Sequence, residues 1–252
     1  MPIGRLVSRA RILTQGRLRS YDLAAVLVQG KSGIEIGGPS NVFHDWFRPL
    51  PIYSRVGALD NCDFSQSTVW AEHRAVFNFK KGKAPGQVYF CEGSDLGAVP
   101  PSRYDFLLSS HNLEHFANPI KALKEWQRVV RPDGHFIIVL PHYAKTFDKR
   151  RKPTVVSHML EDFANNTQED DLSHVEEVFQ AHRLNPGQMP DDDLRALLMD
   201  NFSHRMIHHH CFDETNSREL LEAAGMKVLA LETAFPFHIF LIAEQSKARD
   251  SR

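Results

Sequence analysis

The sequence predicts an α/β fold in which helices cover both faces of a doubly wound, largely parallel sheet. Segments typical of strands alternate with helical segments between residues 33 and 140, the pattern of successive βαβ units. The first of these strands runs into a glycine-rich turn over residues 33–40, as at nucleotide-type sites in such folds. Near the C-terminus, a short link over residues 234–236 joins two apolar segments and predicts an antiparallel hairpin.

The composition is that of an ordinary globular protein, with 252 residues, 42% apolar and 24% charged. A net charge of -1 argues against a nucleic-acid binder that relies on bulk positive charge. No apolar run approaches the ~20 residues of a membrane span, and the arginine-rich N-terminal segment lacks the apolar core of a secretory signal. Three widely spaced cysteines fit a reducing compartment better than a disulfide framework. We therefore expect a soluble cytoplasmic protein that binds neither nucleic acid nor membrane, and its oligomeric state stays open.

The N-terminal part of the chain predicts one helix and two strands. A helix is expected over residues 5–29, where apolar residues recur roughly on one stripe. The first strand carries Glu35 between two isoleucines, and an acid inside a strand is unusual unless it faces a polar partner. The second strand is expected over residues 55–60 and ends on Asp60.

The middle of the chain predicts a short helix, three more strands and an amphipathic helix. The short helix is expected near residues 68–74. The amphipathic helix opens at Pro119, because proline suits the first turn of a helix. The three strands are expected over residues 87–91, 104–109 and 135–140.

The ends of these five strands carry the residues expected to form a ligand site. In an open α/β sheet, ligands bind in the crevice outside the carboxyl ends of the strands. We therefore expect one crevice to be lined by Gly37, Asp60, Asp95, His111 and His142.

Residues 145–207 break the alternation of strands and helices. This long polar interval is too long for a plain connection inside a compact domain. We interpret it as a helical cap inserted into a single domain that spans residues 1–252. Its helices are expected over residues 155–163, 172–182 and 192–199, and the chain then closes with a helix over 214–224 and strands over 226–233 and 237–243.

A family resemblance is carried by two stretches of sequence. Residues 104–119 (YDFLLSSHNLEHFANP) and 122–134 (ALKEWQRVVRPDG), together with the Glu-Ile-Gly-Gly stretch at 35–38, closely resemble class I S-adenosylmethionine-dependent methyltransferases of the type 11 group. The resemblance covers about residues 30–143. It implies a seven-stranded Rossmann-like sheet of order 3-2-1-4-5-7-6 with the seventh strand antiparallel, and S-adenosyl-L-methionine as the cofactor.

The same resemblance implies roles for individual residues in holding the cofactor. The family usually shows Gly-x-Gly-x-Gly, and here Pro39 and Asn41 replace the second and third glycines, which makes the loop stiffer. Cofactor contacts are implied for the methionine part at Glu35, Gly37, Gly38 and Pro39, for the ribose at Asp60 with Asn61, for adenine at Asp95 and Leu96, and beside the sulfonium at Ser110 and His111.

Histidines are the candidate bases. Methyl transfer requires the accepting atom to lie about 3 Å from the methyl group and, where needed, to lose its proton. The candidates are His111, His142 and the run over residues 208–210, from which we select His210, and for each a packing or capping role is the alternative. The run could also bind a metal with neighbouring residues, but successive residues of a strand point to opposite faces, so we predict no metal site.

The expected function is transfer of a methyl group to an oxygen or nitrogen atom of a small molecule or a saccharide. Asp148, Arg150 and Arg151 could recognise an anionic or sugar-like acceptor, or could form a solvated charged run. Two alternatives stay open: a cofactor-binding pseudo-enzyme, favoured by Pro39 and Asn41, and a protein-directed methyltransferase. An RNA acceptor is disfavoured by the near-zero net charge.

Overall fold

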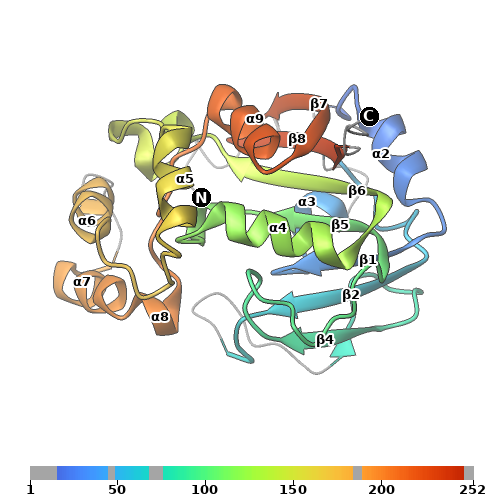
Figure 1. Cartoon of the computed structure of the whole chain (residues 1–252), viewed down its shortest axis with the longest axis horizontal. Coiled ribbons are helices and arrows are strands. Elements are labelled where there is room, and N and C mark those ends of the chain that lie inside the picture. The colour runs from blue at the N-terminus through green and yellow to red at the C-terminus, as the bar shows by residue number, and fades with distance from the viewer. Residues whose placement is uncertain (1–15, 45–48, 68–75, 184–188, 247–252) are drawn as a thin grey trace, which may run out of the picture.

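The computed structural model describes residues 16–44, 49–67, 76–183 and 189–246. Within them the chain forms one sheet of eight strands in the order β3-β4-β2-β1-β5-β6-β8-β7 (Figure 1). The strands β4, β2, β1, β5 and β6 are parallel neighbours, and β8 is antiparallel to both β6 and β7. The strand bounds are β1 Ser32–Ile36, β2 Ala58–Asp63, β3 Val76–Phe77, β4 Gly86–Phe90, β5 Tyr104–Ser110, β6 Val130–Pro141, β7 Met226–Ala234 and β8 His238–Gln245.

This topology confirms the predicted Rossmann-like sheet. Without β3, the spatial order is the expected 3-2-1-4-5-7-6, and the last strand in sequence is the antiparallel one. The difference is β3, a two-residue strand that pairs antiparallel with the edge of β4. The predicted helix over residues 68–74 and the first part of the predicted helix over 5–29 lie outside the described residues.

Two core layers form because successive side chains of a strand point to opposite faces of the sheet. On one face, Leu107 packs in the layer covered by helix α4 (Pro119–Val129) and helix α9 (Glu214–Ala223). On the other face, Leu108 packs in the layer that contains helix α2 (Tyr21–Val28) and helix α3 (Asn41–His44). In Figure 1, α4 and α9 lie in front of the sheet and α3 behind it.

One strand boundary differs from its prediction in a way that matters for the site. The second strand continues to Asp63 rather than ending at Asp60, and pairs Ile34 of β1 with Asp60 and Ile36 with Cys62. The polar sequence after Asp60 does not by itself predict a strand, but Asn61 and Cys62 are buried within the sheet. Asp60 therefore lies three residues before the carboxyl end of its strand.

The interval over residues 145–207 is helical, as expected. It contains α5 (Val156–Ala164), α6 (Val175–Arg183), α7 (Asp191–Met199) and α8 (Asn201–His204), preceded by the short 3-10 helices η2 (Tyr143–Lys145) and η3 (Phe147–Arg150). We call residues 145–207 the insertion. In Figure 1, its helices lie beyond the edge where the parallel strands end. It also has a small core of its own, which includes Val178, Leu198 and Ile207.

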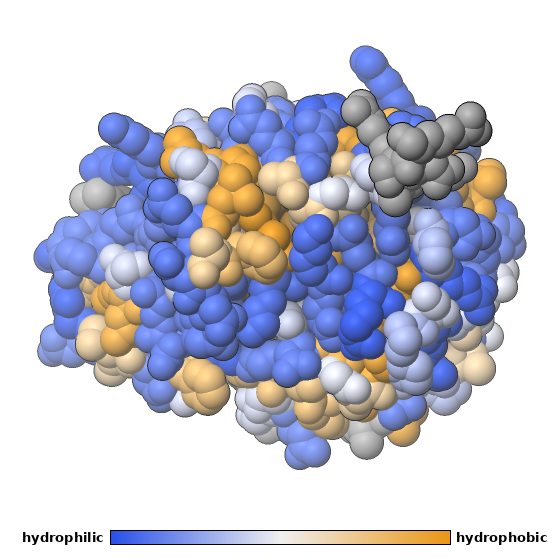
Figure 2. All heavy atoms as spheres, viewed as in Figure 1, coloured by the Kyte–Doolittle hydropathy of each residue, from blue (hydrophilic) through white to orange (hydrophobic). Residues whose placement is uncertain are grey.

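The surface in Figure 2 is largely hydrophilic, with an apolar area over the region of α5 and α9. Leu160 and Phe163 of α5 are among the exposed apolar side chains. None of the described helices is long and apolar enough to cross a membrane.

Candidate active site

A cavity of about 1200 Å³ opens at the carboxyl ends of the parallel strands. Its strand-end wall is formed by Gly37 after β1, Asp63 of β2, Gly93 after β4, Ser110 of β5 and Pro141 of β6. Its opposite wall comes from the insertion, through Glu169 and neighbouring segments. The cavity therefore lies where ligands bind in open α/β sheets.

The glycine loop, residues 37–40, has a backbone shape that side chains would prevent. Gly37 has φ +69°, and a Cβ there would lie 2.1 Å from Oδ1 of Asn112. A Cβ on Gly38 would lie 2.5 Å from the carboxyl carbon of Glu35. Both glycines and Pro39 line the cavity, so the loop presents bare backbone to a ligand, as a cofactor-binding turn requires.

Two of the predicted cofactor residues lie beneath this loop. The side-chain oxygen of Asn61 accepts a hydrogen bond of 2.8 Å from the backbone N–H of Gly38. Glu35 is fully buried and accepts hydrogen bonds from the backbone N–H of Ser40 at 3.1 Å and the hydroxyl of Tyr53 at 2.6 Å. Neither Glu35 nor Asn61 lines the cavity, so their observed role is to support the loop from below.

Burial also sets the ionisation of Glu35. Loss of hydration raises the pKa of its carboxyl to about 7, although the hydrogen bonds from Ser40 and Tyr53 oppose the rise. The loop thus rests on a group that changes charge near neutral pH.

The structure does not bring the predicted ribose and adenine residues to the cavity. The carboxylate of Asp60 accepts hydrogen bonds from the Tyr104 hydroxyl at 2.7 Å and the Gln87 backbone N–H at 2.8 Å. The reason is the longer second strand, which places Asp63 at the cavity instead. The β2 carboxylate that lines the cavity thus lies three positions after the predicted Asp60.

After β4, too, the residues that line the cavity differ from the predicted ones. Asp95 and Leu96 do not line the cavity, and the backbone N–H of Leu96 donates to the Glu125 carboxylate at 2.8 Å. The residues that do line it, Glu92 and Gly93, come first after the strand ends at Phe90.

The predicted pair Ser110 and His111 lies at the cavity wall. His111 has φ +56°, and its backbone N–H donates to the carbonyl of Val139 at 2.9 Å. Its Nε2 lies 2.8 Å from Nδ1 of His238, and its Nδ1 lies 3.6 Å from Oε1 of Glu114. His111 is therefore one member of an imidazole pair with a carboxylate behind it.

Sequence reasoning missed both partners of His111. Glu114 is 1% exposed, and burial opposes its ionisation, but three neighbouring imidazoles outweigh burial and hold the pKa of its carboxyl below the usual range. Those imidazoles belong to His111, His115 and His208. His238 follows the hairpin link and reaches the cavity because β8 pairs with β6. Only the spatial strand order, which puts strand seven beside strand five, could have indicated it.

The other two catalytic predictions, His142 and His210, do not line the cavity. His142 accepts a hydrogen bond of 3.3 Å from the Ala144 backbone N–H and lies 3.2 Å from the Glu214 carboxylate. His210 is buried between the insertion and the core, where loss of hydration lowers its pKa to about 3. His208 lines the cavity instead. Residues 205–210 form no strand, so the alternation of side chains in a strand does not predict which of the histidines faces the cavity.

The predicted acceptor contacts are also changed. Asp148 lies 2.6 Å from Nδ1 of His208 and accepts a hydrogen bond of 2.8 Å from Arg151. Asp148 and Arg151 are both buried, and neither lines the cavity. The cations of that segment that do line it are Lys145 and Lys149.

Fold and site together define a class I S-adenosylmethionine-dependent methyltransferase. The family model described as "Methyltransferase domain" matches residues 9–231, so the chain belongs to this family, and S-adenosylmethionine is its cofactor. The bare-backbone glycine loop at the strand-end wall fits such a ligand. The resemblance stated from the sequence is thereby confirmed.

Solved structures of methyltransferases are similar to this chain at low sequence identity. An S-adenosylmethionine-dependent methyltransferase from Mesorhizobium loti is similar with a TM-score of 0.51 and 14% identity, over 89% of this chain and 96% of that chain. A methyltransferase of the same kind from Aquifex aeolicus has a TM-score of 0.44 and 12% identity, over 94% and 92% of the two chains. The Burkholderia thailandensis 1,6-didemethyltoxoflavin-N1-methyltransferase, solved with S-adenosylhomocysteine, has a TM-score of 0.47 and 15% identity, over 97% and 83%. No curated protein sequence matches the chain.

Proposed function

We propose that this methyltransferase acts on an oxygen or nitrogen atom of a small molecule or a saccharide that binds between the glycine loop and the insertion. The observation that carries the proposal is one cavity of about 1200 Å³ that is walled at one side by the glycine loop and at the other by the insertion. Pockets for a single small ligand usually measure about 300–1,000 Å³. The cavity therefore has room for the cofactor and a second small ligand.

The chemistry of the insertion side favours a polar acceptor. Lys145, Lys149 and Arg205 line it together with the carboxylates of Glu114 and Glu169. Charged groups of both signs can hydrogen-bond hydroxyl and carboxylate groups, as a sugar or a hydroxy acid would offer. In this proposal residues 145–207 act as a cap within a single domain.

In the proposed reaction the bound cofactor supplies an electrophilic methyl group on a sulfonium. The chain's own residues position the acceptor and take its proton. The imidazole pair of His111 and His238 lies at the cavity, and the carboxylate of Glu114 can stabilise the charge that a proton would bring to His111. His111 thus remains our candidate base, acting with His238.

The test is an assay with radiolabelled S-adenosylmethionine against a panel of small hydroxyl and amine compounds, monosaccharides and oligosaccharides. Transfer of label to a panel member supports the proposal. Label found only on added protein would favour the protein-directed alternative.

A pseudo-enzyme is the second candidate, because Pro39 and Asn41 line the cavity where the family usually has glycines. If the assay shows no transfer, calorimetry with S-adenosylhomocysteine shows whether the protein nevertheless binds the cofactor. Tight cofactor binding with no transfer to any acceptor would favour the pseudo-enzyme.

A further inference from the structure

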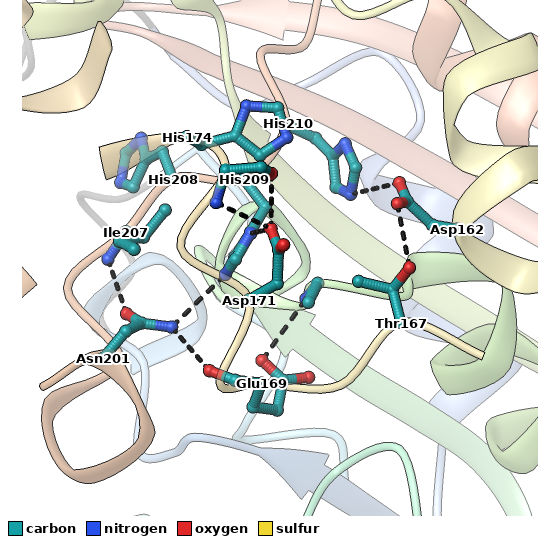
Figure 3. Close-up of polar contacts among 12 residues, drawn as sticks. Asp162, Thr167, Glu169, Asp171, His174, Asn201, Ile207, His208, His209 and His210 are labelled. Carbon is teal, nitrogen blue, oxygen red and sulfur yellow. Dashed lines mark hydrogen bonds and ion pairs between the residues drawn. The ribbon is translucent and has the colours of Figure 1, made fainter. Parts of the chain in front are cut away.

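A cluster of four imidazoles and two carboxylates lies between the insertion and the core, outside the cavity. It consists of two groups of possible metal ligands, one of His158, Asp162 and His210 and the other of Asp171, His174 and His209. None of the six lines the cavity, so the cluster is separate from the methyl-transfer site. Figure 3 shows His210 facing Asp162, with the His209 and Asp171 pair beside them.

The first group has the spacing of ligands around one ion. His158 and Asp162 lie one turn apart on α5 and therefore share a face of the helix. Oδ2 of Asp162 is 3.7 Å from Nε2 of His158 and 3.8 Å from Nε2 of His210. In a tetrahedral zinc site with bonds of 2.0–2.2 Å, neighbouring ligand atoms lie about 3.4 Å apart. Small side-chain rotations would bring the three atoms to that spacing.

Two of the three groups that face the gap have buried atoms without a hydrogen bond. Both ring nitrogens of His210 and Oδ2 of Asp162 are buried and have no hydrogen-bond partner, although the His210 ring lies near the backbone of Ala117. His210 itself is only 1% exposed. Buried polar atoms are nearly always paired, and leaving them unpaired is costly. A cation in the gap would satisfy Asp162 and His210 together.

Two other imidazole–carboxylate pairs, in or next to the insertion, are closer together than this one. Nδ1 of His208 lies 2.6 Å from Asp148, and Nδ1 of His174 lies 2.6 Å from Glu177. Both pairs have closed to hydrogen-bonding distance, whereas His210 and Asp162 remain 3.8 Å apart. The wider separation leaves room for an ion between the two atoms.

The surroundings hold the carboxylate of Asp162 in place. Its other oxygen, Oδ1, accepts a hydrogen bond of 3.2 Å from the Thr167 hydroxyl. This partner orients the carboxylate and leaves Oδ2 for the gap, as second-shell groups do for metal ligands. Nε2 of His174 lies 3.2 Å from Nε2 of His158, so a third imidazole is close to the site.

We propose that His158, Asp162 and His210 bind a divalent transition-metal ion, with zinc as the ion best suited to imidazole and carboxylate ligands. This revises the prediction of no metal that we made from the sequence, which considered the histidine run without α5. The ion would fasten α5 to the segment that carries His208, and so fix the insertion wall of the cavity. Its role is structural, because none of its ligands lines the cavity.

The direct test is metal analysis of the protein with any affinity tag removed. We expect mass spectrometry of the elements to find about one zinc per chain, and removal of the metal with a chelator to lower Tm by about 5 °C or more, reversed by added zinc. Cobalt reconstitution should give the visible absorption of a tetrahedral site. Binding of S-adenosylhomocysteine should persist in the metal-free protein.

Two conservative variants locate the ion. His158→Gln and Asp162→Asn should each reduce bound metal to less than about a tenth of the wild-type content and remove the response of Tm to zinc. His158 is partly exposed, and asparagine keeps the oxygen that accepts from Thr167, so both variants should fold. His204→Gln is the matched control, because His204 belongs to neither ligand group, and it should retain full metal content.

The proposal is overturned by either of two results. One is wild-type protein without stoichiometric metal whose Tm does not respond to zinc or cobalt. The other is a metal content in His158→Gln and Asp162→Asn that equals that of wild type.

Discussion

At the glycine-loop end of the cavity, the backbone itself is the binding surface, shaped by contacts within residues 35–61 and with Asn112. Over the rest of the cavity wall, the surface consists of side chains from segments far apart in sequence, such as Glu114, Arg205 and His238. The first end tolerates almost no change in shape, since a single Cβ would collide with a buried neighbour. The second can change its chemistry without changing the fold. The shared reaction and the particular acceptor are therefore specified by different parts of the molecule.

The largest effect is expected at the glycine-loop end. Gly37→Val should reduce the affinity for S-adenosylhomocysteine by more than about 100-fold, because it places a branched side chain at φ +69° and against Asn112. Calorimetry measures the loss. Gly97→Ala is the matched control, since a Cβ there meets only Asp95 at 3.3 Å, and its affinity should stay near wild type. Equal binding by Gly37→Val and wild type would show that the loop does not hold the cofactor.

A change in the part of the cavity that side chains line should separate turnover from cofactor binding. With an acceptor from the panel, His111→Ala should lower kcat by ~10²–10⁴-fold and leave the affinity for S-adenosylhomocysteine almost unchanged. The loss should shrink as pH rises and the acceptor ionises by itself. His142→Ala, off the cavity, should keep kcat within a few-fold of wild type.

If His111 is structural, its variant should instead keep its turnover per folded molecule and lose about 1–3 kcal/mol of stability. Melting temperature, cofactor affinity and kcat measured on one preparation decide between these outcomes.

The buried Glu35 makes the glycine-loop end sensitive to pH. The pKa of Glu35 is about 7 in the folded protein, against an ordinary value of 4.5, so the folded state keeps a proton that the unfolded state has lost. The free energy of unfolding should therefore fall as pH rises from about 4.5 to about 7, by about 3 kcal/mol in total. Urea unfolding at pH 5 and pH 8 measures this fall, which Glu35→Gln should lack. A similar fall in both proteins would mean that other groups cause it.

The smallest predicted effect tests the strand boundary. Asp63→Asn should weaken S-adenosylhomocysteine binding about tenfold, since Asp63 lines the cavity at the end of β2. Asp60→Asn should change that affinity less than about twofold, because its carboxylate bonds to Tyr104 and Gln87. The reverse order of effects would restore Asp60 as the ribose contact. Calorimetry on both variants gives the answer.

The sequence predicted most elements because their signals are local, and the family resemblance implied the sheet order. Alternating strand and helix patterns, Pro119 at the start of α4 and the hairpin near residue 235 each need only a few neighbouring residues. The glycine loop was found in the same way. Strand ends were harder, because Asn61 and Asp63 are polar residues inside or at the end of a buried strand, and their burial depends on the β1 pairing.

Most of the side-chain contacts outside the glycine loop could not be predicted for a different reason. His238 meets His111 across 127 positions, and His210 faces Asp162 of a helix that the sequence alone does not place. These contacts are set by tertiary packing, which leaves no periodic trace in the sequence. The histidine run was noticed, but only the fold shows that His208 faces the cavity and His210 does not.

The ion pair at the base of the insertion has a consequence for how ligands could reach the site. The guanidinium of Arg151 donates to Asp148 at 2.8 Å, to Glu177 of α6 at 2.6 Å and to the backbone carbonyl of His208 at 2.8 Å. One side chain thus connects a helix on the outside of the insertion to the wall that faces the acceptor. An outward rotation of α6 would have to move this wall with it or break the ion pair between the buried Arg151 and the half-exposed Glu177. Acceptor entry and the position of α6 are therefore mechanically linked, although no residue of α6 lines the cavity.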